Sequence, residues 1–300
     1  MISIAVQGGA WDIPDEMVDA HLHGVRQALK KGWEVLKKGG SAVDAVESAI
    51  MILEDDPTFN AGYGSVMNAL GHIELDAGIM NGKTLRAGAV ACLQNFLHPI
   101  SIARKIMEES EHILLAGVGA ARFAREHGFK VCPADTLVVS RELERWKVLY
   151  AGNSAPSEKK SMEYYGDTVG VVAMDKKGVI VAGTSTGGTP HKYPGRIGDS
   201  PLIGSGVYAD NDVGGVSASG WGEGIITIVM AKAVIDSMAC NGGNPDAAAK
   251  HGIGILKKKV KGTGGVIAIN RKGEVGLAFS TPRMAHAYIT AKMKKPVVAI

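Results

Sequence analysis

The stretch that decides the fold is GDTVGVVAMDKKGVIVAGTSTGG, which covers residues 166–188. Its apolar runs TVGVVAMD and VIVAGTST are separated by the short segment KKG, a pattern that predicts two strands joined by a tight turn. Residues 152–167, which end on the first two residues of this stretch, are polar, contain Gly, Ser and Pro and show no apolar periodicity, so they are predicted to be a linker. Thr168 therefore lies at a sharp boundary between a linker and a buried strand.

The rest of the chain alternates between helical patterns and short apolar runs. A first strand is predicted at 2–6, before Gly8-Gly9, and a second hairpin where GGVIAI and EVGLAF flank NRKG. Apolar spacing and capping signals predict helices at 15–38, from Ser41 to about 53, about 101–110, about 117–127, from Ser140 onward, about 223–238 and about 245–259. Because the strands are largely apolar on both faces, helices must cover both sides. We expect an α+β fold ordered helix layer, sheet, sheet, helix layer.

The composition excludes several classes of function. The 300 residues are 46% hydrophobic and 21% charged, which is typical of a globular protein with a sizeable core. A net charge of +3 is too balanced to indicate nucleic acid or a membrane surface as a partner. The three cysteines are far apart and form no C-x-x-C pair, so neither a disulfide framework nor a zinc site is indicated. With no signal-peptide pattern and no long apolar span, we expect a cytoplasmic protein.

Thr168 also has the chemistry of a candidate nucleophile. A threonine hydroxyl is a poor nucleophile until a base removes its proton. The nine histidines are scattered and no G-x-S-x-G segment is present, so a histidine base is not indicated. If the chain were cut before Thr168, the new α-amino group, with a pKa of about 8, could act as base for the hydroxyl of the same residue. On position alone, an ordinary strand-opening threonine is the simpler interpretation.

Longer runs in both halves of the chain carry a family resemblance. They are GGA at 8–10, NAGYGSV at 60–66, ELDAGIM at 74–80, AGAVA at 87–91, GDTVGVVAMD at 166–175, GTSTGG at 183–188 and KYPGRIGDSPLIGSGVYADN at 192–211. Nearly from end to end, the chain resembles the plant-type L-asparaginases and isoaspartyl aminopeptidases, a branch of the N-terminal nucleophile hydrolases. The resemblance implies a single domain, residues 1–300, with the four-layer αββα sandwich of that superfamily.

The resemblance assigns the nucleophile and a cleavage site. It implies that the precursor cuts itself between Asp167 and Thr168, leaving an α subunit of residues 1–167 with its linker at 152–167 and a β subunit of residues 168–300. Thr168 would then be both nucleophile and, through its α-amine, base. Thr186 in TSTGG matches a threonine that hydrogen-bonds near the nucleophile and tunes it. The family resemblance also suggests a homodimer of αβ units.

A substrate site is implied by the run GRIGDSP. Arg196 and Asp199 match the residues that hold the free α-carboxylate and α-amino group of the substrate, and Gly222 matches a glycine whose carbonyl helps to bind the amino group. The chemistry is suitable, since a guanidinium binds a carboxylate through two parallel hydrogen bonds and a carboxylate can bind an ammonium. The alternative is a simple salt bridge within the loop between Arg196 and Asp199.

The expected oxyanion hole differs from the family pattern. The family uses a Thr-Gly pair, and the aligned residues in SASGWGEG are Ser219 and Gly220. Serine keeps the hydroxyl but has a freer χ1, so the donor is held less tightly. Trp221 stands where the family usually has a small residue and could narrow the pocket or change which leaving groups fit. Gln7 replaces a histidine that often precedes the Gly-Gly pair. These departures bear on substrate preference more than on reaction type.

The segment LEDDPTFNAGY, residues 53–63, resembles a loop that binds a structural sodium ion through backbone carbonyls. Hard oxygen ligands suit such a cation. The aligned carbonyls are those of Leu53, Glu54, Asp56, Phe59, Ala61 and Tyr63. The same sequence could form a turn without metal. Asn60 is expected near the nucleophile, and no cofactor is expected for catalysis.

The sequence therefore predicts an autoprocessing N-terminal threonine amidohydrolase that acts on small molecules. Its substrates would be the side-chain amide of L-asparagine, the isopeptide bond of β-aspartyl dipeptides, or both, with L-aspartate as a product. One alternative is a related glycosylasparaginase or threonine endoprotease. Another, from a different class, is a non-catalytic homologue that binds a small molecule.

Overall fold

The computed structural model describes residues 1–151 and 168–300, so the linker expected at 152–167 lies outside the described residues. Two β-sheets form the centre of the fold. The large sheet has the order β12-β11-β1-β5-β6-β2-β3-β4, and its strands are β1 Ser3–Trp11, β2 Leu75–Asn81, β3 Ala87–Leu93, β4 Leu114–Ala116, β5 Val169–Met174, β6 Ile180–Thr186, β11 Arg283–Thr290 and β12 Val297–Ala299. The small sheet has the order β10-β9-β8-β7, with β7 Val207–Asp210, β8 Gly214–Gly220, β9 Gly264–Asn270 and β10 Val275–Phe279.

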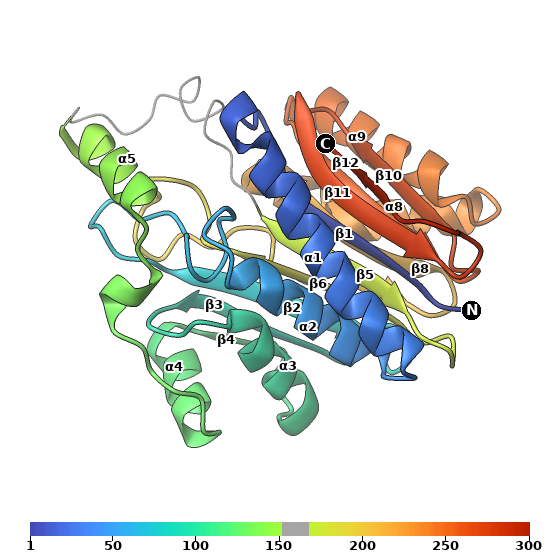
Figure 1. Cartoon of the computed structure of the whole chain (residues 1–300), viewed down its shortest axis with the longest axis horizontal. Coiled ribbons are helices and arrows are strands. Elements are labelled where there is room, and N and C mark those ends of the chain that lie inside the picture. Colours follow the sequence, from blue (N-terminus) through green and yellow to red (C-terminus); the bar gives the residue numbers. More distant parts are fainter. Residues whose placement is uncertain (152–167) are drawn as a thin grey trace.

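Helices cover the outer face of each sheet (Figure 1). On the large sheet lie α1 Val18–Lys37, α2 Ala42–Glu54 and α3 Pro99–Glu109, and on the small sheet lie α8 Met230–Cys240 and α9 Pro245–Val260. The remaining helices are α4 Gly117–Glu126, α5 Ser140–Ala151, α7 Gly222–Ile228 and the short 3₁₀ turns η1 Asp15–Met17 and η2 Ala134–Leu137. The predicted order of helix layer, sheet, sheet and helix layer is therefore present.

Three hydrophobic cores separate the four layers, and the strand that follows Thr168 divides its side chains between two of them. Val169, Val171 and Ala173 lie in the core beneath α1, α2 and α3. Val172 and Met174 lie in the core between the two sheets. Successive side chains of a strand point to opposite faces, so an apolar residue at nearly every position is what a strand buried on both faces requires.

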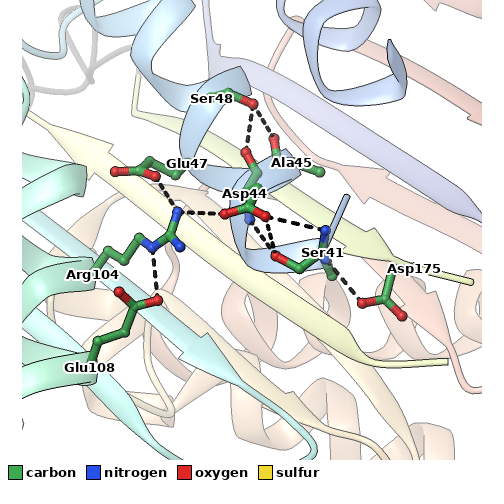
Figure 2. Close-up of polar contacts among 9 residues, drawn as sticks. Ser41, Asp44, Ala45, Glu47, Ser48, Arg104, Glu108 and Asp175 are labelled. Atoms are coloured by element: carbon green, nitrogen blue, oxygen red, sulfur yellow. Dashed lines mark hydrogen bonds and ion pairs between the residues drawn. The ribbon is translucent and has the colours of Figure 1, made fainter. Parts of the chain in front are cut away.

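The N-terminus of α2 ties the outer helices to the far end of β5. The Ser41 hydroxyl accepts a hydrogen bond from the Asp44 backbone N–H, and the Asp44 carboxylate accepts one from the Ser41 N–H, which completes a capping box. Arg104 on α3 contacts Asp44, Glu47 and Glu108, as Figure 2 shows. Burial raises the pKa of Asp44, but hydrogen bonds from Ser41 and Arg104 outweigh this and hold it below its usual value.

The same helix N-terminus contacts the residue that follows β5. The Ala42 N–H donates to the Asp175 carboxylate at 3.1 Å, directly after the strand that Thr168 precedes (Figure 2). Asp175 also accepts backbone hydrogen bonds from Lys177 and Val179 in the tight turn between β5 and β6. The hairpin predicted from residues 166–188 is thus present, and its turn is anchored to α2.

Some predicted elements are wrong in extent. β1 runs on through Gly8 and Gly9 to Trp11, with a register shift between Gln7 and Ala10 that absorbs the two glycines. The helix predicted at 223–238 is two helices, because Val229 adopts a left-handed φ of 51° that interrupts the hydrogen-bond ladder. Strands β4, β7, β8, β11 and β12 were not predicted. Glycines and polar residues in β7 and β8 weaken the local strand pattern, and contacts across the sheet form these strands.

Within residues 1–151 and 168–300, no helix is both long and apolar enough to cross a membrane.

Candidate active site

Thr168 lies against Thr186 because of the register of the β5–β6 hairpin. The strands pair with Val169 opposite Ser185, which places Thr168 beside Thr186 at the open end of the hairpin. The Thr168 hydroxyl donates to the Thr186 Oγ1 at 3.2 Å, and the same oxygen accepts from the Gly188 N–H at 3.0 Å. Thr168 is only 6% exposed. The bond to Thr186 therefore restrains the direction of the candidate nucleophilic hydroxyl.

A small pocket opens at this hydroxyl pair. The residues that line it come from both sheets and from the loops after β6 and β8, and they are Thr168, Thr186, Gly188, Thr189, Arg196, Gly198, Asp199, Gly220 and Gly222. Six of these were predicted as site residues. They share one pocket although Thr186 and Gly220 lie on different sheets, because the two sheets pack face to face at this end.

Arg196 and Asp199 line the pocket but do not form an ion pair with one another. Arg196 instead pairs with Glu223 of α7, with Nε to Oε1 at 2.9 Å and Nη2 to Oε2 at 2.8 Å. Asp199 is 4% exposed, and its Oδ2 has no hydrogen-bond partner among the described residues. Burial raises the pKa of Asp199 to about 7, against the opposing effect of the Arg196 charge. The alternative of a salt bridge between the two residues is not what the structure shows.

The glycine at position 222 leaves room for the side chains of Arg196 and Asp199 to face the same small space. A Cβ at Gly222 would lie 2.7 Å from the Arg196 Nη2 and 3.1 Å from the Asp199 Oδ1. Both atoms therefore face the same small space, which only a residue without a side chain leaves open. A cation and an anion side by side, with no direct bond between them, suit a zwitterionic ligand.

Ser219 and Gly220 end β8, beside the pocket. Gly220 lines the pocket at a φ of 138°, and a Cβ there would lie 2.4 Å from the Gly264 Cα, so the position requires glycine. Ser219 is fully buried and is absent from the pocket lining. Its Oγ accepts a hydrogen bond from the Ala10 N–H at 3.1 Å. That contact fixes the position of the oxygen and leaves the serine hydrogen available for donation.

The two other departures from the family pattern lie behind the site. Trp221 is absent from the pocket lining, and its ring packs towards Gly224 and Gly262, so it does not narrow the pocket. Gln7 is fully buried opposite Gly170 in β5, and its Oε1 accepts from the Gly9 N–H at 2.7 Å. Its effect is therefore on the β1 bulge and the strand that carries Thr168.

Asn60 reaches the nucleophile through the turn at 187–188. Its side-chain amide donates to the Gly188 carbonyl at 2.7 Å, and its backbone carbonyl accepts from the Gly187 N–H at 2.9 Å. A Cβ at Gly187 would lie 2.3 Å from the Asn60 Oδ1, so the contact is close. Asn60 thereby holds the turn whose Gly188 N–H binds Thr186, and through that turn it is linked to the nucleophile.

Comparison with known proteins assigns the chain to a family. Residues 1–299 match the profile of the family described as asparaginase. The chain belongs to the asparaginase family.

Curated relatives in this family cover nearly the whole chain. It is 43% identical to an "Isoaspartyl peptidase/L-asparaginase" of Xenopus laevis, over 95% of this chain and 91% of the relative. It is 42% identical to a protein of the same name from Bos taurus, over 93% and 90%. It is 43% identical to a "Plant-type L-asparaginase" of Pyrococcus horikoshii, over the full length of both chains. The resemblance drawn from the motifs is thereby confirmed, as is the N-terminal nucleophile hydrolase fold.

In this member of the asparaginase family, a group of buried charges beneath the pocket was not predicted. Lys192 is 5% exposed, and its ammonium donates to the Glu74 carbonyl at 2.8 Å. Burial lowers the pKa of Lys192, although the charges of Asp76 and Glu74 oppose this. Asp76 accepts backbone hydrogen bonds from Cys92 and from Gly198, and the latter lines the pocket. Sequence patterns mark such residues as polar loop positions, so only their burial reveals them.

Proposed function

We propose that this chain is an autoprocessing N-terminal threonine amidohydrolase that hydrolyses L-asparagine and β-aspartyl dipeptides and releases L-aspartate. The observation that carries the proposal is the 3.2 Å contact between the Thr168 and Thr186 hydroxyls in a pocket that also contains Arg196 and Asp199. The names of the relatives, which pair isoaspartyl peptidase with L-asparaginase, support the same substrates.

The pocket residues would bind the amino-acid head of the substrate. The Arg196 guanidinium would donate two parallel hydrogen bonds to the α-carboxylate, and the charged form of Asp199 would bind the α-ammonium. The Gly222 carbonyl would accept a second hydrogen bond from the same ammonium. With the α-carboxylate and α-ammonium held by these residues, the side-chain amide of asparagine would extend towards Thr168 in the orientation that attack requires.

Cleavage between Asp167 and Thr168 would convert the Thr168 nitrogen from an amide to an amine. The neutral amine would take the hydroxyl proton, and Oγ1 would attack the amide carbonyl to give a tetrahedral intermediate. Its oxyanion would be stabilised by the Ser219 hydroxyl and the Gly220 N–H. Ammonia or an amino acid leaves with a proton from the amine, and water then hydrolyses the acyl-threonine to release aspartate. Thr186 keeps the attacking oxygen in place throughout.

The test combines intact-mass measurement with product analysis. Incubated protein is expected to split into fragments of residues 1–167 and 168–300, and the cut protein to release ammonia from L-asparagine and leucine from β-aspartyl-leucine. Thr168→Ala protein should stay intact and inactive. A Thr168→Ala protein that cuts itself and hydrolyses asparagine would refute the role of Thr168. A wild-type chain that stays whole and inactive would instead favour a non-catalytic binding protein.

The same assay separates related amidohydrolases. A glycosylasparaginase would prefer a glycosylasparagine over asparagine, and a threonine endoprotease would cut longer peptides that lack a free aspartyl head. Because Arg196 and Asp199 lie in one small pocket with Thr168, we expect a substrate with a free α-amino and α-carboxylate group to be used best.

We also propose that residues 53–63 bind a structural sodium ion through backbone carbonyls. The close turns of this loop support the idea, since a Cβ at Gly62 would lie 2.6 Å from the Glu54 carbonyl oxygen and one at Gly64 would lie 2.8 Å from that of Phe59. No cluster of His, Cys, Asp and Glu among the described residues could hold a metal by side chains instead. The carbonyls concerned are those of Leu53, Glu54, Asp56, Phe59, Ala61 and Tyr63. The ion would order the loop from which Asn60 holds the 187–188 turn.

Two further expectations concern assembly and compartment. We propose a homodimer of αβ units, which light scattering coupled to gel filtration would test directly. All three cysteines are free thiols, which supports action in a reducing compartment such as the cytoplasm.

A further inference from the structure

The ion pair of Arg196 with Glu223 uses only one edge of the guanidinium. Glu223 contacts Nε and Nη2, the side-on edge, at 2.9 and 2.8 Å. Within the described part of the chain, Glu223 is the only acidic residue within 4.0 Å of this guanidinium. A guanidinium has a second bidentate edge, formed by Nη1 and Nη2, whose donors point in a different direction. The end-on edge of Arg196 is therefore left for another partner.

This end-on edge faces the pocket. A Cβ at Gly198 would lie 2.9 Å from Nη1, and a Cβ at Gly222 would lie 2.7 Å from Nη2. Both glycines line the pocket, so the two donors of the end-on edge lie between two parts of its wall. Glu223 lies on the other side, at the start of α7, with its side chain half exposed. The carboxylate thus holds the guanidinium from outside the pocket.

Without Glu223, Arg196 would still have an anion close by, because Asp199 lies beside the same glycine. The Asp199 Oδ1 and the Arg196 Nη2 both lie close to the same point above Gly222. A long arginine side chain released from Glu223 would rotate towards Asp199, and the resulting ion pair would occupy both halves of the zwitterion site. The ion pair with Glu223 itself is partly exposed to solvent, and such pairs contribute little to the stability of a fold.

We propose that Glu223 is a positioning residue that sets specificity for substrates with a free α-carboxylate, by holding Arg196 away from Asp199 with its end-on edge towards the pocket. The proposal rests on the function proposed above and deepens it. Glu223 itself touches no substrate. It acts through Arg196, so its loss affects the binding of the α-carboxylate and leaves the reacting hydroxyl of Thr168 unchanged.

The experiment compares Glu223→Ala and Glu223→Gln with wild-type protein, all after complete cleavage as judged by intact mass. The substrates are L-asparagine and 3-aminopropanamide, which is asparagine without its α-carboxylate. For Glu223→Ala we expect KM for asparagine to rise roughly tenfold or more, as for loss of a charge-assisted contact, with little change in kcat. The value of kcat/KM for 3-aminopropanamide should change much less. Glu223→Gln keeps one acceptor for Arg196, so its KM for asparagine should lie between those of wild type and Glu223→Ala.

A matched control is Glu126→Ala, which removes a similar exposed partner from Arg122 on α4. This variant should leave kcat and KM for both substrates unchanged. A second readout is the pH dependence of asparagine binding, which should move to lower pH in Glu223→Ala because the Arg196 charge would then lie against Asp199. Equal losses on both substrates, or a fall in kcat with KM unchanged, would overturn the positioning role.

Calorimetric titration separates this inference from the proposed reaction. L-Aspartate and β-alanine, which lacks the α-carboxylate, are titrated into wild type and Glu223→Ala. A wild type that binds aspartate, and prefers it to β-alanine only while Glu223 is present, supports the inference even if the protein hydrolyses nothing. A wild type that hydrolyses asparagine while Glu223→Ala keeps the full preference for aspartate refutes the inference and leaves the proposed function intact. Absence of any aspartate binding by wild type refutes the inference, and the proposed function is then judged by hydrolysis alone.

Discussion

The raised pKa of Asp199 predicts that binding of the substrate's α-ammonium group depends on pH. Burial raises this pKa to about 7, and only the charged carboxylate can bind an ammonium. Because the pKa is raised, the charged form is present above about pH 7 and is lost as the pH falls through that value. Well below the pKa, the charged fraction, and with it the affinity for an α-ammonium, falls about tenfold per pH unit.

The assay removes the other titrating groups by comparison of two substrates. Succinamic acid is asparagine without its α-amino group, and both substrates depend equally on the α-amine of Thr168. We therefore expect the ratio of kcat/KM for asparagine to that for succinamic acid to fall roughly twentyfold from pH 7.5 to pH 5.5. In Asp199→Asn protein the ratio should be small and independent of pH. A ratio that stays constant over this range in wild type would refute the assignment of Asp199 to the α-ammonium.

Three further predictions concern the nucleophile, the pocket wall and the loop at 53–63. Thr186→Val should lower kcat roughly 10–100-fold because it removes the hydroxyl bonded to the nucleophile. The control Thr184→Val removes a buried hydroxyl bonded at 2.7 Å to a backbone carbonyl, and it should affect stability alone. Equal losses of kcat in the two variants would contradict this prediction. Gly220→Ala should destabilise the fold by about 3 kcal/mol or more in thermal unfolding, whereas Gly254→Ala in α9, where a Cβ meets nothing within 4 Å, should stabilise it by ~0.5–1 kcal/mol. Replacement of sodium by choline at constant ionic strength should lower the unfolding temperature by roughly 2 °C or more, and an unchanged transition would argue against the ion.

The sequence by itself determined the features that depend on local pattern. The apolar runs on either side of KKG predicted the β5–β6 hairpin, since a strand buried on both faces must be apolar at nearly every position. The hairpin then places Thr168 beside Thr186, because antiparallel register joins its first and last residues. The flanking motifs identified Arg196 and Asp199, and both line the pocket with the threonines.

Only the tertiary structure decided how distant residues meet. The pairing of Arg196 with Glu223 joins a loop to the start of α7, and the contact of the Ser219 hydroxyl with the Ala10 N–H joins two different sheets. Whether Trp221 lines the pocket depends on the space beside Gly224 and Gly262. Periodicity along a chain records whether each position is buried, but the choice of partner depends on how the two sheets pack face to face. That packing brings β8 and the loop after β6 to the same end as Thr168.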